Sequence, residues 1–159
     1  MFLNKKKFIF LTSIFSLVFL LILTDAKPQE LLVVDGDTIH LNGEKIRFTG
    51  IDTPELKQTC VKDKTKKPCG TKAKQMLINK IGNNNIECIR EGRDQYKRTL
   101  AECFVNNESL SSYLVRSGYA FAYRKYSKKF IEDENYAKIN QLGMWSMKFD
   151  YPWDFRKNN

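Results

Sequence analysis

Histidine is almost absent from this chain of 159 residues, which contains His40 and no other histidine. Zinc sites built from several histidines are therefore excluded, and a Ser-His-Asp or Cys-His arrangement would have to use His40. Acidic residues are also few: 18 aspartates and glutamates stand against 27 lysines and arginines, which gives a formal net charge of +9. This charge favours a polyanionic partner. We expect the chemistry to come from carboxylates, arginines and a metal ion.

The sequence also lacks an apolar run of the roughly 20 residues that a membrane-spanning helix needs. Its longest run, Phe8–Leu23, follows three lysines and precedes the small residue Ala26. These are the basic, apolar and small-residue regions of a secretory signal peptide, so we expect export and cleavage after Ala26. Residues 1–26 would then contact the membrane transiently, and 27–159 would form one domain. An uncleaved N-terminal anchor is the alternative.

No C-x-x-C pair is present among the four cysteines, so an oxidising compartment favours two disulfides over the competing interpretation, a zinc site. Cys88 and Cys103 lie in two strand-like runs around a polar turn at 95–96. In a hairpin with that centre the two cysteines are directly opposite and close enough to be bridged. Cys60 is then left to pair with Cys69 across a short, lysine-rich loop.

Short apolar runs separated by turn residues predict a β-meander at the start of the domain. The runs are Leu31–Val34, Thr38–Leu41 and Lys45–Ile51, and Asn42-Gly43 between the last two is a strong hairpin signal. The hairpin that carries the second cysteine pair adds strands four and five.

Three helices are predicted from apolar residues at helical spacing. The first lies between Gly70 and Gly82, the second includes Leu110–Leu114 and ends at Gly118, and the third spans Phe130–Leu142. With the five strands, they favour an α+β fold that is mainly β: a five-stranded OB-type barrel with three helices packed outside. Such barrels suit nucleic acids or sugar chains, although a fold alone does not establish a function.

Acidic turns stand at the ends of neighbouring predicted strands. Asp37 follows the first strand, Arg47 lies in the third, and Asp52 and Glu55 lie at its far end. Asp37 and Asp52 can offer oxygen ligands to a hard cation such as Ca²⁺, which leaves Glu55 as a base. Arg47 and Asp52 are five residues apart, so they face opposite ways on an ideal strand unless the strand end re-aims one of them. Each turn taken alone is equally an ordinary solvated loop.

These motifs resemble the staphylococcal nuclease (thermonuclease) family, in the family's order, over roughly Leu31 to Trp145. The residues that carry the resemblance are Val34-Asp35-Gly36-Asp37-Thr38, Arg47, Ile51-Asp52-Thr53-Pro54-Glu55, Tyr96-Lys97-Arg98-Thr99-Leu100-Ala101, Leu114-Val115-Arg116-Ser117-Gly118-Tyr119-Ala120 and Gly143-Met144-Trp145. The resemblance implies an OB-like barrel with three helices and Ca²⁺-dependent hydrolysis of phosphodiester bonds. It also implies individual roles: one Ca²⁺ ion held by Asp37, Asp52 and the backbone carbonyl of Thr53, phosphate bound by Arg47 and Arg98, a nucleotide contact by Tyr96, and Glu55 as the base.

Two features stand beside this resemblance. Lys97 occupies the position before Arg98 where family members usually have glycine. The segment Lys57–Lys80 holds eight lysines and one acidic residue, and it directly follows Glu55. We expect Lys57 and its neighbours to contact the backbone of a nucleic acid, and a solvated loop is the alternative.

The C-terminal part is rich in aromatic residues, which we expect to form core and a tail packed on the barrel: Phe121, Tyr123, Tyr126, Phe149, Tyr151, Trp153 and Phe155. The sequence as a whole predicts an exported, disulfide-stabilised, monomeric, Ca²⁺-dependent nuclease of DNA, RNA or both, with little sequence preference. One alternative is an OB-fold module that binds nucleic acid or protein without turnover. Another is an envelope factor that acts on a different anionic polymer, such as an acidic polysaccharide.

Overall fold

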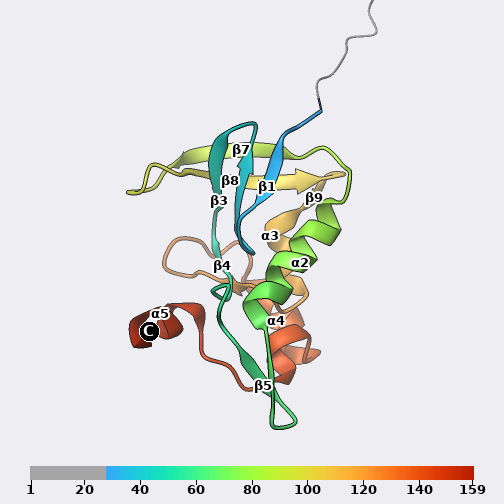
Figure 1. Cartoon of the computed structure of the whole chain (residues 1–159), viewed down its shortest axis with the longest axis vertical. Helices are drawn as coiled ribbons and strands as arrows, with labels where there is room; N and C mark the ends of the chain where they lie inside the picture. The colour runs from blue at the N-terminus through green and yellow to red at the C-terminus, as the bar shows by residue number, and fades with distance from the viewer. Residues whose placement is uncertain (1–27) are drawn as a thin grey trace, which may run out of the picture.

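A computed structural model of the chain describes residues 28–159 (Figure 1). The predicted signal segment 1–26 lies outside the described residues, so its cleavage and the domain boundary after Ala26 stay predictions. Within 28–159, no helix combines the length and the apolar character that a membrane crossing requires.

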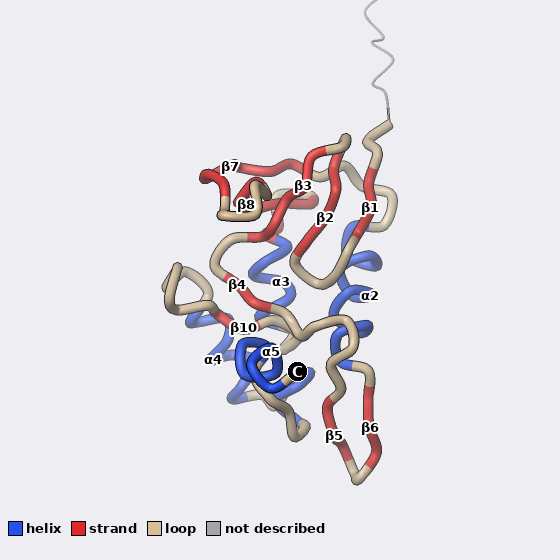
Figure 2. The backbone as a smooth tube through the Cα atoms, turned by 60° about the vertical axis from the view of Figure 1, so that its left-hand side comes forward, coloured by secondary structure: helices blue, strands red, loops and turns tan. Residues whose placement is uncertain are grey.

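Five strands form the main sheet, in the spatial order β1-β2-β3-β8-β7 (Figure 2). They are β1 (Leu31–Val33), β2 (Thr38–Leu41), β3 (Glu44–Phe48), β8 (Thr99–Val105) and β7 (Glu87–Arg93). Neighbouring strands are antiparallel except β3 and β8, which run parallel. A further short strand, β9 (Glu108–Ser109), pairs with the end of β8. The predicted α+β, OB-type arrangement is confirmed.

Two hairpins hold the registers that their turn residues predict. Asn42 and Gly43 join β2 to β3 with φ of 51° and 81°, the positive values that a two-residue hairpin turn requires. In the β7–β8 hairpin, Cys88 lies opposite Cys103, and a disulfide joins them across a Cα–Cα distance of 4.1 Å. The predicted opposition of these two cysteines is therefore present.

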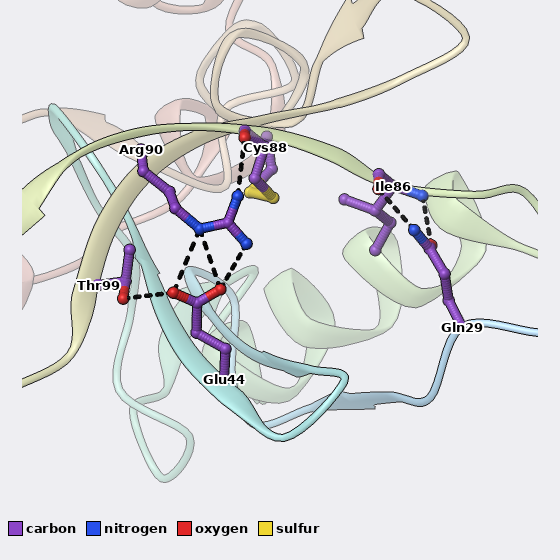
Figure 3. The surroundings of a disulfide bond; sticks show 7 residues. Gln29, Glu44, Ile86, Cys88, Arg90 and Thr99 are labelled. Atoms are coloured by element: carbon purple, nitrogen blue, oxygen red, sulfur yellow. Dashed lines mark hydrogen bonds and ion pairs between the residues drawn. A yellow bond between two sulfur atoms is a disulfide. The ribbon is translucent and has the colours of Figure 1, made fainter.

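Side chains link the two edges of the sheet. Gln29, just before β1, donates its amide N–H to the carbonyl of Ile86 (2.9 Å) and accepts the Ile86 N–H (2.7 Å), just before β7 (Figure 3). Glu44 on the central strand β3 accepts hydrogen bonds from the hydroxyl of Thr99 on the adjacent strand β8 and from Arg90 on the edge strand β7 beyond it. The sheet is thus curled so that its first and last strands approach each other.

The three predicted helices are α2 (Cys69–Ile81), α3 (Leu110–Arg116) and α4 (Ile131–Ile139), and they lie to one side of the sheet (Figure 1). Leu77 of α2 and Leu114 of α3 are fully buried in one cluster with the apolar residues of the strands. The third helix ends three residues before the predicted Leu142. The chain there turns through Gln141, whose φ is 50°.

A small hairpin that the sequence did not predict lies inside the loop closed by the Cys60–Cys69 disulfide. Its strands are β5 (Cys60–Lys62) and β6 (Thr65–Lys67), and it projects from the end of the molecule opposite the main sheet (Figure 2). A backbone bridge from Val61 to Lys148 ties it to the C-terminal segment.

The C-terminal segment forms the 3₁₀ helix η1 (Gly143–Ser146) and a fourth helix, α5 (Pro152–Asn158), beyond the three that were predicted. Phe121 lies at the centre of an aromatic cluster that holds this segment to the domain. The rings within 6.2 Å of it, centre to centre, belong to Trp145, Phe149, Tyr151 and Trp153. The predicted aromatic packing is confirmed for these residues, whereas Tyr126 is exposed and the expectation that it belongs to the core is wrong.

The predicted strand Lys45–Ile51 is wrong in its extent. β3 ends at Phe48, and Gly50, with φ of 72°, redirects the chain. The next two residues form β4 (Ile51–Asp52), which pairs with β10 (Phe121–Ala122) in a separate two-stranded sheet. This break places Thr53, in the acidic turn, against Asp37, which directly precedes β2.

Candidate active site

The loop between β1 and β2 presents Asp37 to the chain that leaves β4. The N–H of Thr53 donates to Asp37 Oδ2 at 3.0 Å, and the N–H of Asp37 donates to Asp35 Oδ1 at 3.0 Å. Gly36 is required by close approach, because a Cβ there would lie 2.8 Å from Thr53 Oγ1. The Asp35-Gly36-Asp37 turn therefore fixes one carboxylate against the turn that carries the others.

Arg47 joins the two buried aspartates. Its guanidinium donates to Asp37 Oδ1 through Nη1 and to Asp52 Oδ1, 2.9 Å away, through Nη2. On an unbroken strand Arg47 and Asp52 would face opposite ways, but the turn at Gly50 brings them to the same side. Arg47 itself is 18% exposed, so its guanidinium reaches the surface between the two acids.

Burial governs the charge in this cluster. Asp37 and Asp52 are 1% and 0% exposed. Burial raises the pKa of Asp37 to about 6, against the opposing influence of Arg47. Burial alone would lower the pKa of Arg47, but the Asp37 and Asp52 carboxylates together raise it.

Glu55 is held by Gln58, a buried glutamine that no motif or spacing marks in the sequence. The N–H of Glu55 donates to Gln58 Oε1 (3.1 Å), and the N–H of Gln58 donates to the Glu55 carbonyl (2.7 Å). Gln58 Nε2 also donates to the carbonyl of Asp150 (2.7 Å), which ties this turn to the C-terminal segment. At Gly70 a Cβ would fall 1.8 Å from the Glu55 carbonyl, so the start of α2 presses directly on the turn.

Arg156 of α5 is a second guanidinium in the cluster, and sequence reasoning missed it. Nη2 donates to Asp52 Oδ2 (2.7 Å), and Nη1 donates to both Asp52 Oδ1 (3.2 Å) and Glu55 Oε1 (2.7 Å). Burial alone would lower the pKa of Arg156, but the hydrogen bonds that it donates to Asp52 and Glu55 raise it. Neither spacing nor a motif marks this residue, which lies 104 positions from Asp52.

Arg98 and Tyr96 lie together at the β7–β8 turn. Arg98 pairs with Asp94 at 2.7 Å, and its guanidinium carbon lies 5.6 Å from the centre of the Tyr96 ring. Lys97 between them has φ of 61°, the left-handed conformation that glycine adopts without strain. Among residues 28–159, the hydrogen bonds do not join Arg98 to Asp37, Asp52 or Glu55.

Lys57 lies beside the carboxylate cluster. It lines a hollow of about 310 Å³ with Glu55, Leu56, Phe155, Arg156 and Asn159. The remaining lysines of the predicted basic segment extend from here along the β5–β6 hairpin and α2, where most are exposed. Positive charge thus adjoins the acidic cluster on this side.

The oxygen atoms of the cluster suit a hard cation. Within the described part of the chain, no three Asp, Glu, His or Cys side chains converge as a ready metal site. Such ions also take backbone carbonyls and waters as ligands, so two carboxylates with the neighbouring Thr53 carbonyl are a sufficient start. The two buried carboxylates draw on two guanidiniums, those of Arg47 and Arg156, which shows a demand for positive charge. The residues present therefore fit a divalent cation at Asp37, Asp52 and Thr53.

Comparison with known proteins places this geometry in context. Residues 45–147 match the family described as Staphylococcal nuclease homologue. The chain is 28% identical over 121 residues to an uncharacterized endonuclease of Haemophilus influenzae, covering 72% of this chain and 63% of that protein. It is 35% identical over 129 residues to Endonuclease YncB of Bacillus subtilis (71% and 58%) and 29% identical over 117 residues to Succinoglycan biosynthesis protein ExoI of Rhizobium meliloti (71% and 61%). The chain spans about three fifths of the length of these relatives.

The matched segment contains every predicted site residue except Asp37, which precedes it. Arg156 follows the segment, as does the whole of α5. The C-terminal contribution to the cluster is therefore additional to what the family match covers.

Proposed function

Because this chain belongs to the staphylococcal nuclease family, we propose that it hydrolyses phosphodiester bonds of DNA, RNA or both, with Ca²⁺ as cofactor and little sequence preference. The observation that carries the proposal is the convergence of Arg47, Asp37 and Asp52 at the break after β3, with Glu55 on the following turn. A module that only binds a polyanion has no use for three carboxylates beside its substrate.

The residues divide the work of hydrolysis between them. Asp37, Asp52 and the Thr53 carbonyl would hold the cation, which supplies positive charge to the scissile phosphate. Glu55 accepts a proton from the attacking water while the oxygen of that water bonds to phosphorus, and the bond from phosphorus to the leaving oxygen breaks. Arg47 and Arg98 stabilise the negative charge that builds on the nonbridging oxygens, since guanidinium pairs well with phosphate. The leaving oxygen takes its proton from solvent.

On this proposal Arg98 contacts the phosphate from the hairpin tip, where its guanidinium pairs with Asp94 beside the Tyr96 ring. That ring is largely exposed and available to a base. We infer that the substrate strand runs between the hairpin tip and the carboxylate cluster, and that it continues over Lys57 and the lysines of the β5–β6 hairpin. Such backbone contacts carry no sequence information, which accords with low specificity.

The test uses the purified protein with its disulfides intact and labelled single-stranded DNA and RNA, with Ca²⁺ or with a chelator. We expect cleavage that requires Ca²⁺ and that falls about a hundredfold to ten-thousandfold in Glu55→Gln. Glu91→Gln, which changes an exposed glutamate on β7, is the matched control and should cleave normally. Binding of both nucleic acids without any cleavage would refute the proposal and favour a binding module.

An acidic polysaccharide is a second candidate substrate, because one relative is named a succinoglycan biosynthesis protein. A polymer that binds at the same basic surface would compete with DNA. Competition by an acidic polysaccharide, together with its depolymerisation in the presence of Ca²⁺, would favour this alternative; inhibition alone, or no effect, would leave the nuclease as the activity.

We also propose that the protein is exported. The two disulfides support this, since such bonds persist in oxidising compartments. Fractionation of cells that express the full chain, with N-terminal sequencing of the product, tests both export and cleavage after Ala26.

A further inference from the structure

The C-terminal helix α5 supplies a guanidinium to the candidate active site from outside the segment that matches the family. Arg156 engages both carboxylate oxygens of Asp52 and one oxygen of Glu55, at distances from 2.7 to 3.2 Å. Asp52 is fully buried, and its other guanidinium partner is Arg47. This contact therefore involves one proposed cation ligand and the proposed base at once.

Packing fixes where α5 stands. Trp153, on its first turn, stacks on Tyr151 (centres 4.6 Å apart) and on Tyr123 (5.8 Å), with ring planes within 9° of parallel. Tyr151 and Trp153 also contact Phe121, which is the strand partner of Asp52 in the β4–β10 pair. The aromatic cluster thus connects the helix that carries Arg156 with the strand that carries Asp52.

The charges of the cluster do not balance. Asp37, Asp52 and Glu55 are three acids, and Arg47 and Arg156 are the two guanidiniums bonded to them. A divalent cation beside Arg47 would match three negative charges without any help from Arg156. Arg156 donates to both Asp52 oxygens, so a cation that binds Asp52 competes with this guanidinium for the oxygen lone pairs and is repelled by its charge. The Arg156 side chain is 40% exposed and borders the hollow beside Glu55, so it has room to turn away.

We propose that Arg156 belongs to the active site and sets its affinity for the divalent cation by competing with the cation for Asp52 and Glu55. This inference rests on the proposed function in one respect, the assignment of Asp52 as a cation ligand. α5 then keeps the carboxylates paired until the cation concentration is high enough to displace a guanidinium.

Calorimetric titration of Ca²⁺ into the purified protein, without nucleic acid and at pH 8, tests the proposal. We expect Arg156→Gln to bind Ca²⁺ about tenfold more tightly than the unaltered protein, because one charge-assisted competitor is removed. Arg156→Lys should fall between the two, since a lysine ammonium keeps the charge but cannot form the paired contact. Lys157→Gln is the matched control, because among residues 28–159 Lys157 pairs with Asp154 of the same helix and with no other acid, and it should bind as the unaltered protein does.

A second variant reaches the same contact by another route. Trp153→Ala removes the stacked ring that docks α5, so it should also tighten Ca²⁺ binding while Arg156 is still present. Circular dichroism of the aromatic bands reports whether the cluster is intact in each variant. Unchanged or weaker Ca²⁺ binding in a folded Arg156→Gln protein overturns the proposal, as does the absence of Ca²⁺ binding at millimolar concentrations.

The two proposals fail separately. Tighter Ca²⁺ binding in Arg156→Gln with no cleavage of nucleic acid by any variant would refute the nuclease and leave the role of Arg156 standing. Ca²⁺-dependent cleavage with equal Ca²⁺ affinities would do the reverse.

Discussion

Two aspartate–arginine pairs in this molecule lie in different surroundings and behave differently. Asp37, 1% exposed, pairs with Arg47 inside the carboxylate cluster, whereas Asp94, 16% exposed, pairs with Arg98 at the tip of a hairpin. Burial raises the pKa of Asp37 to about 6 in spite of its arginine. Burial alone would also raise the pKa of Asp94, but the hydrogen bonds from Arg98 lower it below its ordinary value.

The difference shows what each pair is suited to do. At the hairpin tip, one arginine satisfies one carboxylate and is held in a definite direction. In the cluster, buried carboxylates lie close together away from water, and the guanidiniums of Arg47 and Arg156 supply the positive charge that stabilises them. Buried carboxylates that need positive charge are suited to binding a cation. A single arginine held in one direction by one carboxylate is suited to binding a phosphate.

Removing the arginine from each pair should separate them most strongly. Arg47→Met leaves two buried carboxylates without their shared partner, so we expect a loss of about 3–5 kcal/mol in the free energy of unfolding. Arg98→Met breaks a partly exposed pair and should cost less than about 1 kcal/mol. Urea denaturation with the disulfides intact measures both. Equal losses would mean that the cluster is no more dependent on its arginine than the hairpin tip.

Replacing the buried acid should change how stability depends on pH. Because the pKa of Asp37 is raised on folding, from 3.8 to about 6, ionising it opposes folding: the penalty is absent below the unfolded pKa and complete above about pH 6. Relative to the unaltered protein, Asp37→Asn should therefore gain up to about 3 kcal/mol of stability between pH 4 and pH 7.

Urea denaturation in the presence of a chelator measures the free energy of unfolding of both proteins. The informative quantity is how the difference between them changes with pH. The absolute stability of Asp37→Asn also includes the altered hydrogen bonds to Arg47 and Thr53. Asp63→Asn, at an exposed turn, is the control and should show little slope. If the difference in unfolding free energy between Asp37→Asn and the unaltered protein did not change with pH, a raised pKa of Asp37 would be contradicted.

The parts of the fold that the sequence predicted are those with local signals. Asn42-Gly43 specifies its turn through the positive φ that both residues tolerate, and that turn sets the register of β2 on β3. The cysteines of β7 and β8 were placed by counting from a polar turn. Helix α2 follows from apolar spacing and ends beside Gly82, as expected. In each case the determining residues lie within a few positions of one another.

The parts that escaped prediction depend on contacts between distant residues. The sequence predicts a continuous strand through Gly50, because no residue near Asp52 in the sequence indicates that Asp52 pairs with Phe121. Gln58 has no periodicity to mark it as buried, and its partner is the Asp150 carbonyl, 92 positions away. Arg156 looks like one more basic residue in a tail. The identities of the predicted acids followed from motifs, whereas the residues that hold them in place did not.

A smaller effect is expected at the turn that directs Arg98. Lys97 has φ of 61°, a conformation that costs an ordinary residue about 1–2 kcal/mol. Glycine removes that strain but loses more entropy on folding, about 0.5–1 kcal/mol, so Lys97→Gly should stabilise the protein by up to about 1.5 kcal/mol. Thermal unfolding measures the gain. Lys128→Gly, in an exposed loop, is a control for the loss of a lysine; a loss of stability in Lys97→Gly would show that the turn is not strained.

The smallest effect completes the contrast between the two aspartates. Asp94→Asn keeps an oxygen to accept the N–H groups of Tyr96 and Arg98 and removes only the charge that faces the guanidinium. Because the pKa of Asp94 is lowered on folding, its charge stabilises the protein above the unfolded pKa, and this contribution disappears as pH falls through the folded pKa. We expect Asp94→Asn to be less stable at pH 7 by under about 1 kcal/mol and equal to the unaltered protein in strong acid. Its difference from the unaltered protein should thus become more unfavourable as pH rises, while that of Asp37→Asn becomes more favourable. Slopes of the same sign, measured by urea denaturation across this pH range, would mean that burial does not distinguish the two pairs.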